Sequence, residues 1–532
     1  MTTLPGSGLT TSEHALDLPR DYNAAVWFVD RHLKQGRADK TAFIDAAGSH
    51  SYGQLAEKVN RAGNALKGLG LRIENRIAMI MLDTVDFPAV FWGAIKAGIV
   101  PIPLNTLLTT GDYGYMLSDS RARVLVISEE LYDKVEPILQ DLPLLETVVI
   151  SGQNGHGHPL LSDLLDKAEP KLKTAETTRD DVAFWLYSSG STGAPKGAVH
   201  LQRDLPATAV HYGQQVLGVQ EDDVTFSAAK LFFAYGLGNG MTFSLHAGAT
   251  SVLLKDRPTP EAVMNILRDH QPTIYYGVPT LYGSILADPQ YNRASGSTRL
   301  RACVSAGEAL PEDVGRRWEE RFGAAILDGL GSTEMLHIFL SNRHGEVHYG
   351  TSGKAVPGYH LRVVDDEGRE VPRGEMGELI VRGPSSAVAY WNQREKSLKT
   401  FRGEWTFTGD KYFVDEEGYY RYAGRGDDML KVGGIWVSPF EVEAALISHE
   451  KVLEAAVVGE ADAEGLVKPK AYVVLAPGET GGEVLVEELQ AYVKAKLAPY
   501  KYPRWIEFVE ALPKTATGKI QRFKLRGGLQ QL

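Results

Sequence analysis

The chain contains almost no cysteine and carries no excess of positive charge. Cys303 is the one cysteine among 532 residues, so neither an internal disulfide nor a cysteine-based metal cage can form. This usage fits a reducing compartment, and the apolar neighbours of Cys303 predict a buried side chain rather than a reactive thiol. The formal net charge of −11 argues against a general nucleic-acid binder.

The chain also lacks a long, uninterrupted hydrophobic run. Residues 1–20 have neither the basic start nor the apolar core of a signal peptide. The most hydrophobic stretch, residues 90–108, is interrupted by Lys96, Pro101 and Pro103, which predicts a helix, a turn and a strand rather than a membrane span. We therefore expect a soluble, cytoplasmic protein with no membrane or nucleic-acid partner, either a monomer or a homodimer.

Apolar segments alternate with helical ones along most of the chain, and its length predicts several domains. Leucine, valine and alanine recur at helical spacing over residues 55–69, as expected of an amphipathic helix. Strand candidates without polar alternation are typical of α/β layers with parallel sheets. We expect strands at 77–82, 124–127, 147–150, 182–187, 250–254, 274–278 and 302–305, and helices at 55–69, 87–97 and 259–269.

The character of the sequence changes at about residue 345. Short pieces rich in Gly, Val and Arg run to about residue 422 and predict the hairpins of a β-rich subdomain. Two glycines beside charged residues at 424–428 indicate a hinge. Beyond it we expect helices at 440–447 and 484–497, and strands at 453–458, 471–475 and 505–509. The prediction is a large N-terminal domain over 1–426, with stacked, mostly parallel sheets and the β-rich subdomain at about 345–422, and a small α+β C-terminal domain over 427–532.

Residues 187–197, YSSGSTGAPKG, concentrate hydroxyls, glycines and one lysine in a single loop. Glycine lets the backbone turn its N–H groups inward without Cβ clashes, serine and threonine add donors, and Lys196 adds positive charge. Such a nest suits an anionic polyphosphate. The G-x-x-x-x-G-K-[ST] spacing of a Walker loop is absent. A flexible surface turn is the alternative interpretation, which Pro195 and Lys196 disfavour.

Four further motifs follow in order along the chain. They are LGSTE at 330–334, FTGD at 407–410, GRGDD at 424–428 and PKTATGKI at 513–520. Together with the loop at 187–197, they resemble the motifs of the adenylate-forming superfamily of acyl-CoA synthetases, luciferases and peptide-synthetase adenylation domains. The resemblance runs from about Tyr22 to Lys519. It implies ATP, Mg²⁺ and coenzyme A as cofactors or co-substrates, and a C-terminal domain that moves as a lid.

The resemblance implies how the phosphates of ATP would be held. Residues 188–196 resemble the loop that grips the β- and γ-phosphates, and Thr333 resembles the residue that contacts the α-phosphate. Glu334 resembles the residue that holds Mg²⁺, and a carboxylate suits a cation that prefers oxygen ligands.

The resemblance also implies contacts to the nucleoside. Residues 305–309 resemble an adenine-side loop, and Asp410 and Arg425 resemble ribose contacts. At Leu330 the sequence departs from the pattern, because many relatives carry an aromatic side chain there that stacks on adenine. The implied ATP and AMP contacts are Ser188, Ser189, Gly190, Ser191, Thr192, Gly193, Lys196, Ala306, Gly307, Glu308, Asp328, Gly329, Thr333, Asp410 and Arg425.

Lys519 resembles the catalytic lysine of the C-terminal domain. A cation between a carboxylate and an α-phosphate would stabilise the negative charge that is spread over the transition state. The implied reaction forms an acyl-adenylate and pyrophosphate, and a thiol then displaces AMP. Between the steps the C-terminal domain would rotate near Asp427, exchanging Lys519 for a segment that lines a thiol tunnel. The implied hinge and CoA residues are Asp427, Lys431, Gly433, Gly434 and Trp436, with a core position as the alternative for Trp436.

Residues 230–239 match the segment that lines the acyl pocket in the superfamily. Phe233 stands where amino-acid adenylating relatives place an aspartate, so an amino-acid substrate is disfavoured. Phe233, Ala234 and Tyr235 would form a flat, mostly apolar slot with one hydroxyl, although plain core packing is the alternative for these aromatics. The implied substrate contacts are Phe233, Ala234, Tyr235, Gly329, His337 and Ile338.

Three segments, 19–25, 230–239 and 334–339, most resemble the benzoate–CoA ligases of this superfamily. The resemblance implies a ligase that converts benzoate and CoA to benzoyl-CoA, AMP and pyrophosphate through a benzoyl-adenylate. Three alternatives stay open. One is a ligase for an amino- or hydroxybenzoate or another small acid, one is a free-standing enzyme that loads a carrier protein, and one is a non-catalytic binding relative.

Overall fold

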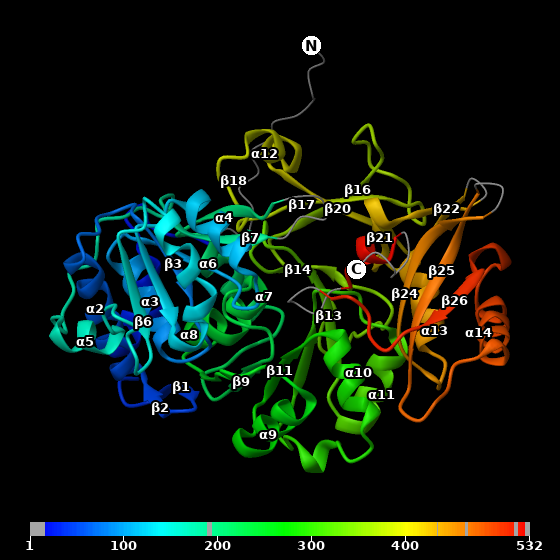
Figure 1. Ribbon diagram of the computed structural model, residues 1–532, viewed down its shortest axis with the longest axis horizontal. Helices are drawn as coiled ribbons and strands as arrows, with labels where there is room; N and C mark the ends of the chain where they lie inside the picture. The colour runs from blue at the N-terminus through cyan, green and yellow to red at the C-terminus, as the bar shows by residue number, and fades with distance from the viewer. Residues whose placement is uncertain (1–15, 189–193, 433–434, 463–465, 515–519, 527–532) are drawn as a thin grey trace.

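Two mostly parallel sheets with helices on their faces form the larger part of the molecule (Figure 1). The computed structural model describes residues 16–188, 194–432, 435–462, 466–514 and 520–526. The first sheet has the strand order β4-β3-β5-β6 and is parallel throughout. The second has the order β15-β14-β13-β12-β11-β9-β10-β1-β2, in which the pairs between β13 and β1 are parallel. This arrangement confirms the predicted α/β fold class.

The predicted strands at 77–82, 124–127, 147–150, 250–254, 274–278 and 302–305 lie close to observed strands of these two sheets, whereas β1, β2, β9, β14 and β15 were not predicted. The first sheet comprises β3 (Arg76–Ile80), β4 (Val100–Pro103), β5 (Val124–Ser128) and β6 (Thr147–Ser151). The second comprises β1 (Thr41–Asp45), β2 (Gly48–Ser51), β9 (Val224–Ser227), β10 (Thr250–Val252), β11 (Ile274–Gly277), β12 (Ala302–Ser305), β13 (Ile326–Gly331), β14 (Ile338–Ser341) and β15 (Lys354–Ala355). Their central strands are buried, because helices cover both faces of a parallel sheet.

Three of the helices, α2, α4 and α9, begin after a residue whose side chain accepts a hydrogen bond from a free N–H group of the first turn. Ser51 and Gln54 form a capping box at the start of α2 (Tyr52–Gly68), so the helix begins three residues before the predicted one. The other helices of this part are α1 (Arg31–Lys34), α3 (Asp86–Lys96), α4 (Thr110–Ser120), α5 (Leu161–Lys167), α6 (Asp204–Thr208), α7 (Ala234–Leu237), α8 (Phe243–Ala247), α9 (Pro260–His270), α10 (Pro279–Ala287) and α11 (Glu312–Phe322). No helix in the described part of the chain combines the length and apolar character that crossing a membrane requires.

The strands on either side of the glycine-rich loop form an antiparallel hairpin. Ser188 at the end of β7 (Val182–Ser188) pairs directly with Lys196 at the start of β8 (Lys196–Leu201). A third strand, β18 (Ala389–Tyr390), pairs with β8. This pairing brings a segment almost two hundred residues further along the chain to the side of Lys196.

A separate antiparallel sheet follows the large sheet in sequence, which confirms the predicted β-rich region. It comprises β16 (His360–Val364), β17 (Gly377–Arg382), β19 (Phe401–Arg402), β20 (Trp405–Val414) and β21 (Tyr420–Arg425). The short helix α12 (Arg394–Thr400) lies between β18 and β19.

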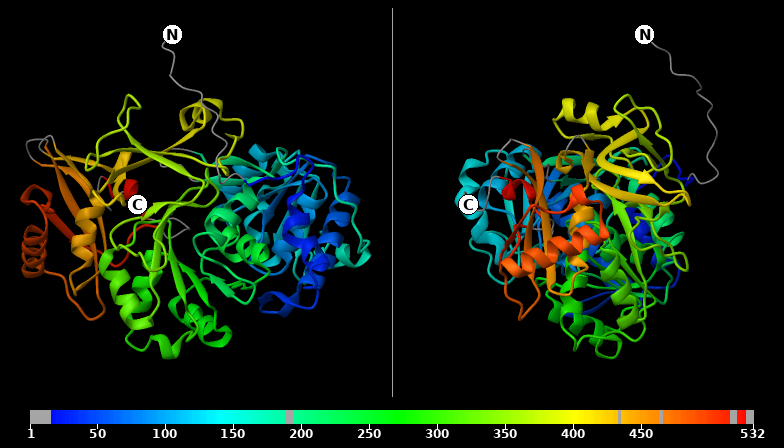
Figure 2. Two further views of the ribbon diagram at one scale, coloured as in Figure 1. Left: turned by 180° about the vertical axis from the view of Figure 1, so that it is seen from behind. Right: turned by 90° about the vertical axis from the view of Figure 1, so that its right-hand side faces the viewer.

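The C-terminal part is a small α+β unit with hydrophobic clusters of its own. Its elements are β22 (Leu430–Val432), β23 (Ile435–Val437), α13 (Pro439–Ile447), β24 (Val452–Ala461), β25 (Val467–Leu475), α14 (Glu483–Lys496), β26 (Trp505–Phe508) and α15 (Arg522–Leu525). Figures 1 and 2 show this orange-to-red part beside the green part, where β24 contacts α10. The exact boundary at 426 and 427 stays a prediction.

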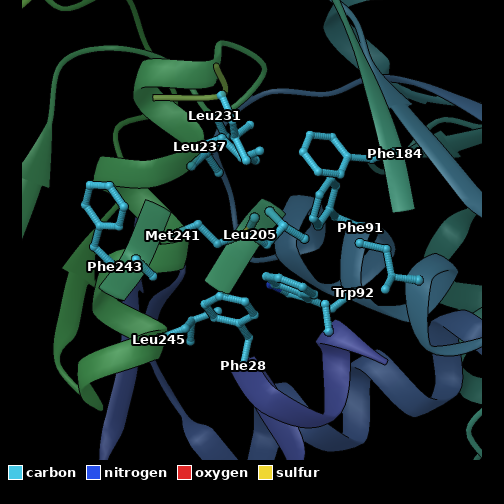
Figure 3. Close-up of a cluster of buried hydrophobic side chains, with 14 of the residues drawn as sticks. Phe28, Phe91, Trp92, Phe184, Leu205, Leu231, Leu237, Met241, Phe243 and Leu245 are labelled. Atoms are coloured by element: carbon cyan, nitrogen blue, oxygen red, sulfur yellow. The ribbon is translucent and has the colours of Figure 1, made fainter. Parts of the chain in front are cut away.

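One hydrophobic core joins the predicted acyl segment to the strand that leads into the glycine-rich loop. Phe91 of α3 meets Phe184 of β7 edge-on at 5.5 Å between ring centroids, and Phe28 stacks on Trp92 at 4.9 Å. Figure 3 shows side chains from the acyl side in the same cluster, namely Leu231, Leu237, Met241, Phe243 and Leu245. The acyl segment is therefore packed against the helix α3 and the strand β7 on its buried side.

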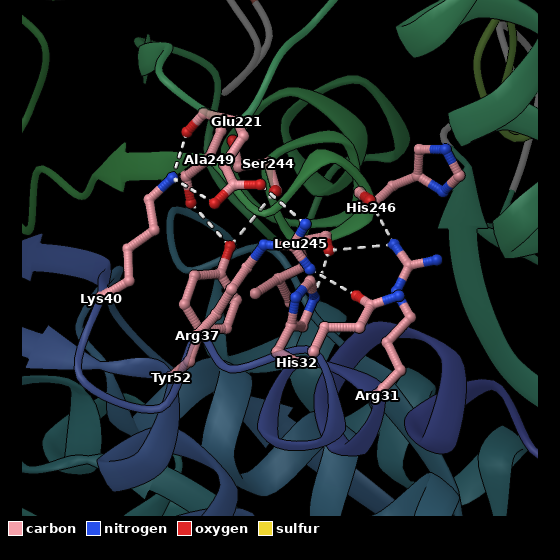
Figure 4. Close-up of polar contacts among 11 residues, drawn as sticks. Arg31, His32, Arg37, Lys40, Tyr52, Glu221, Ser244, Leu245, His246 and Ala249 are labelled. Carbon is pink, nitrogen blue, oxygen red and sulfur yellow. Dashed lines mark hydrogen bonds and ion pairs between the residues drawn. The ribbon is translucent and has the colours of Figure 1, made fainter.

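Polar contacts tie the N-terminal helices to the segment around α8 (Figure 4). Nε2 of the buried His32 contacts the carbonyl oxygen of Leu245 at 2.6 Å, and the hydroxyl of Tyr52 donates to the carbonyl of Ala249 at 2.7 Å. Since both side chains are buried, each hydrogen bond satisfies a group that would otherwise be costly to remove from water.

Candidate active site

The carboxyl ends of neighbouring parallel strands bring three predicted segments to one edge of the large sheet. β9 leads into residues 230–239, β12 leads into residues 306–309, and β13 carries Asp328 and Gly329. The register aligns Ser305 with Gly277 on one side and with Asp328 on the other. Ligands of open α/β sheets bind outside the carboxyl ends of the strands, so this edge is the place for the candidate site.

Glu334 and Lys196 meet at this edge through Tyr390. The Tyr390 hydroxyl donates to Oε1 of Glu334 at 2.7 Å and accepts from Nζ of Lys196 at 3.3 Å. Lys196 Nζ also lies 4.4 Å from the centre of the Tyr390 ring, within range of a cation–π interaction. The Ser188 hydroxyl donates to the same Oε1 at 3.2 Å. Both ends of the glycine-rich loop therefore lie next to Glu334.

Glu334 is held in its charged form. Burial raises the pKa of Glu334, but Lys196, the Tyr390 hydroxyl, a backbone hydrogen bond and Arg425 together lower it by more, so the pKa falls below its ordinary value. Burial lowers the pKa of Lys196, and Glu334 opposes that effect. An anionic carboxylate beside a lysine and a serine hydroxyl suits a divalent cation that arrives with a polyphosphate. Among the described residues, no cluster of three or more His, Cys, Asp or Glu side chains could hold a metal ion.

Asp410 and Arg425 face each other across two neighbouring strands. They are direct partners in the pairing of β20 with β21, and Arg425 Nε lies 3.0 Å from Asp410 Oδ1. Asp410 is the largest cause of the raised pKa of Arg425. The Asp410 side chain is 9% exposed and that of Arg425 is 51% exposed. The two strands thus present a carboxylate, which accepts hydrogen bonds, next to a guanidinium, which donates them. Both kinds of group are suited to the predicted contacts with the ribose hydroxyls.

The predicted adenine-side loop contacts a residue close to the end of the chain. Ala306 is buried and Gly307 adopts a φ of +97°. Oε1 of Glu308 accepts the N–H of Ile520 at 3.0 Å. Lys514 and Ile520 form a β-bridge, and Lys514 Nζ lies 2.7 Å from Oε1 of Glu454. The residue directly after the predicted catalytic lysine therefore lies against the adenine-side loop.

Asp328 is a buried carboxyl group beneath this loop. Burial raises its pKa to about 8, although Ser305 and the N–H groups of Leu310 and Gly329 lower it. The carboxyl group is therefore mostly protonated at neutral pH, and it can donate a hydrogen bond as well as accept one.

The predicted acyl segment, residues 230–239, contains α7. The Tyr235 hydroxyl lies 3.1 Å from the carbonyl oxygens of both Gly277 and Val304, so its single proton is shared between these two backbone acceptors. Burial raises the pKa of Tyr235 well above its ordinary value. Phe233 and Ala234 are half-buried and pack against the main core. The predicted role of these residues as the wall of an acyl slot stays a prediction.

His337 is a neutral imidazole packed among aromatic rings. Burial lowers its pKa to about 3. Nε2 faces two acceptors, Asn239 Oδ1 at 3.1 Å and the carbonyl of Tyr235 at 3.3 Å, so this nitrogen carries the proton. The ring lies edge-on to Phe243 at 4.6 Å. A Cβ at Gly238 would lie 2.4 Å from the His337 ring, which explains why glycine stands there. Ile338, the next residue, is buried at the start of β14.

Several predicted residues are not tested by these contacts. Ser189, Gly190, Ser191, Thr192, Gly193, Gly433, Gly434 and Lys519 lie outside the described residues, as do the side chains of Asp427 and Trp436. Lys431 is exposed on β22. The roles of all these residues stay predictions.

Tyr390 is a site residue that the sequence analysis missed. It lies 56 residues from Glu334 and 194 residues from Lys196 along the chain. No local spacing could reveal it, because the pairing of β18 with β8 is what places it. The N–H of Ala387, just before β18, also donates to the carbonyl of Glu334 at 2.7 Å.

Comparison with known proteins defines the class. The profile of the AMP-binding enzyme family matches residues 29–391, and that of the AMP-binding enzyme C-terminal domain matches residues 441–519. The chain belongs to the AMP-binding enzyme family, which confirms the predicted superfamily.

Particular relatives are similar over their whole length. A benzoate–CoA ligase of Thauera aromatica is 60% identical over 528 residues, which cover 99% of this chain and 100% of that protein. A 4-hydroxybenzoate–CoA/benzoate–CoA ligase of Rhodopseudomonas palustris is 52% identical, covering 96% of each. The crystal structure of a benzoate CoA ligase from Burkholderia xenovorans superposes with a TM-score of 0.89 at 52% identity, covering 95% of this chain and 100% of that one. The structure of an anthranilate CoA ligase in complex with anthranoyl-AMP gives 0.92 at 45% identity, covering 96% and 97%.

Proposed function

We propose that the protein is an ATP-dependent benzoate–CoA ligase, an acid–thiol ligase that forms benzoyl-CoA, AMP and pyrophosphate through benzoyl-adenylate. The observation that carries the proposal is the end-to-end similarity to benzoate–CoA ligases. The acyl segment agrees with it, because Phe233 and Ala234 are neutral, the Tyr235 hydroxyl is bonded to the backbone and His337 is uncharged. Such a wall favours an aromatic ring over a charged amine.

In the first half-reaction, a carboxylate oxygen of benzoate forms a bond to the α-phosphorus of ATP. The bond from that phosphorus to the bridging oxygen breaks, and pyrophosphate leaves with the electron pair. Residues 188–196 would bind the β- and γ-phosphates, and Thr333 would contact the α-phosphate. Glu334 would hold Mg²⁺, which when bound neutralises charge on the phosphate oxygens. Asp410 and Arg425 would bind the ribose, and the 306–309 loop with Asp328 and Gly329 would enclose the adenine.

Lys519 would supply the mobile positive charge between the two reacting anions. The hydrogen bond from Ile520 to Glu308 supports this role, because it brings the neighbouring residue to the nucleotide side of the site. Holding the carboxylate and the α-phosphate in line also lowers the activation barrier, because the two reactants no longer have to find the reactive orientation.

In the second half-reaction, the CoA sulfur forms a bond to the acyl carbon, AMP leaves with the electron pair of the broken C–O bond, and the thiol proton is lost. The C-terminal domain would turn near Asp427 between the steps. Lys431, Gly433, Gly434 and Trp436 would then line the path of the thiol. We place the reaction in the cytoplasm, and the oligomeric state stays predicted as monomer or homodimer.

Ring-substituted benzoates are the second candidate substrates, because the relatives include a 4-hydroxybenzoate–CoA ligase and an anthranilate CoA ligase. A panel of carboxylic acids, assayed for acid-dependent AMP release with and without CoA, tests both candidates. We expect benzoate to give the highest kcat/KM and benzoyl-CoA as the product. A higher kcat/KM for an amino- or hydroxybenzoate would favour the second candidate. If none of the acids in the panel led to the release of pyrophosphate, both candidates would be refuted.

A further inference from the structure

A buried histidine and a buried aspartate lie directly behind the Thr333–Glu334 turn. His200 belongs to β8, four residues after Lys196, and Asp204 is the first residue of α6. The side chains of both residues are almost fully buried, at 0% and 1% exposure. The His200 ring stacks on Phe184 at 5.3 Å between centroids, with 17° between the planes. Nothing in the proposed mechanism so far uses this pair.

Both nitrogens of the His200 ring contact an acceptor. Nδ1 lies 2.9 Å from Oδ2 of Asp204, and Nε2 lies 2.8 Å from the carbonyl oxygen of Thr333. A carbonyl oxygen cannot donate, so Nε2 must carry a proton. The contact between Nδ1 and Asp204 needs a second proton, which makes the pair neutral as a whole. The same Asp204 oxygen also accepts the N–H of Leu201 at 3.0 Å, which fixes the carboxyl group relative to β8.

The carbonyl oxygen of Thr333 is the hydrogen-bond acceptor that closes a tight turn. It accepts the N–H of Leu336 at 3.1 Å as well as His200. Leu336 has a φ of +65°, a left-handed conformation that costs energy for a residue with a Cβ and persists only when its surroundings enforce it. Because the Thr333 carbonyl belongs to the peptide unit that leads into Glu334, the His200 bond fixes the plane from which the Glu334 side chain departs.

We propose that His200, oriented by Asp204, is a positioning residue that holds the Thr333–Glu334 turn against β8. The strand β8 also carries Lys196, so one strand sets the places of Lys196 and Glu334 relative to each other. The arrangement resembles the carboxylate–imidazole pairs that orient metal ligands from outside the coordination sphere. The inference rests on the proposed function, because it assigns Thr333 and Glu334 to the nucleotide.

Two substitutions at His200 separate the two hydrogen bonds. The amide nitrogen of glutamine reaches the place of Nε2, whereas that of asparagine reaches only the place of Nδ1. His200→Gln therefore keeps the donor to the Thr333 carbonyl, and His200→Asn loses it. We expect His200→Asn to slow benzoate-dependent ATP–pyrophosphate exchange by about 10- to 100-fold. We expect His200→Gln to recover most of that loss, and both variants to thiolyse supplied benzoyl-adenylate nearly as well as the unmodified enzyme.

His32 provides the matched control. It is also fully buried, and its Nε2 also contacts a backbone carbonyl, that of Leu245 (Figure 4). His32→Asn and His32→Gln should lower the midpoint of urea unfolding as the His200 variants do, but they should leave pyrophosphate exchange unchanged. Equal loss of exchange in His200→Asn and His200→Gln, or equal loss of exchange and thiolysis, would overturn the inference.

A spectroscopic measurement tests the contact without any turnover. In ¹⁵N-histidine-labelled enzyme, the His200 signals, identified by their absence in His200→Gln, should show a protonated Nε2. A bare Nε2 would overturn the inference. Failure of the proposed function would appear differently, as absent pyrophosphate exchange in the unmodified enzyme, whereas failure of this inference would appear as normal exchange in His200→Asn.

Discussion

The hydroxyl of Tyr390 lies 2.7 Å from Oε1 of Glu334 and donates a hydrogen bond to it. The same tyrosine contacts Lys196 through its oxygen and its ring. A carboxylate and an ammonium group from distant parts of the chain are thus oriented by the same tyrosine, and side chains that are fixed in this way reduce the reorganisation that binding requires.

Tyr390→Phe should weaken the use of MgATP. The ring and its contact with Lys196 remain, but Glu334 loses a hydrogen bond to its charged group, which is worth about 1.5 kcal/mol or more. We expect the KM for MgATP in pyrophosphate exchange to rise roughly tenfold, with the KM for benzoate nearly unchanged. Tyr113→Phe is the control, because it removes a buried hydroxyl that bonds to the carbonyl of Asn105 at 2.8 Å. A raised KM for benzoate alone would contradict the assignment.

Lys519→Ala should separate the two half-reactions. Loss of the positive charge between the reacting anions should slow adenylate formation by at least about 100-fold, while thiolysis of supplied benzoyl-adenylate continues. Lys514→Ala is the matched control, since it removes a lysine of the same motif that pairs with Glu454. Rapid-quench measurement of each half-reaction decides the matter, and equal slowing of both would refute the division of labour.

Gly238→Ala should impair the acyl side of the site and spare the nucleotide side. The added Cβ would lie 2.4 Å from the His337 ring, so that imidazole must move. We expect kcat/KM for benzoate to fall by more than about tenfold, by analogy with overpacking costs of 1–3 kcal/mol, with an unchanged KM for MgATP. Gly283→Ala on α10 is the control, because its Cβ would meet nothing within 4 Å. Unchanged benzoate kinetics in Gly238→Ala would remove His337 from the acyl wall.

Asp83 should make the free energy of unfolding depend on pH. It lies behind the acyl segment and accepts the N–H of Leu231 at 3.2 Å. Burial raises its pKa to about 6, with Lys230 and the Leu231 N–H opposing. The folded state therefore binds this proton more tightly than the unfolded chain. The resulting stabilisation is complete below the unfolded pKa of about 4 and is lost as the pH rises through about 6.

Asp83→Asn cannot ionise, so its stability relative to the unmodified enzyme should rise with pH by up to roughly 3 kcal/mol. Urea unfolding of both proteins over a series of pH values measures this difference. A difference that stays constant over the series would show that Asp83 is not the titrating group.

Local patterns predicted the elements of the fold but not the partners of the site residues. Apolar runs identified β3, β5, β6, β11 and β12, because strands buried on both faces have no polar alternation. Periodicity identified α2, but its start was missed because the capping pair Ser51 and Gln54 precedes the apolar stripe.

Candidate site residues could be predicted from the sequence when they belong to a recognisable motif. They could not be predicted when only a contact with a distant segment identifies them. Glu334 and Lys196 stand in motifs, whereas Tyr390, His200 and Asp83 acquire their roles through strand pairing and through contacts between distant segments. The acceptors of the Tyr235 hydroxyl, the carbonyls of Gly277 and Val304, could not be read from local sequence, because they belong to distant segments.

The most direct test of the account follows the oxygen atoms of benzoate. Turnover of benzoate labelled with ¹⁸O in its carboxylate, in the presence of ATP and CoA, should give AMP that carries one labelled oxygen and pyrophosphate that carries none. This result is required if a carboxylate oxygen attacks the α-phosphorus and the thiol later breaks the C–O bond. Unlabelled AMP, or label in pyrophosphate or phosphate, would contradict the adenylate mechanism.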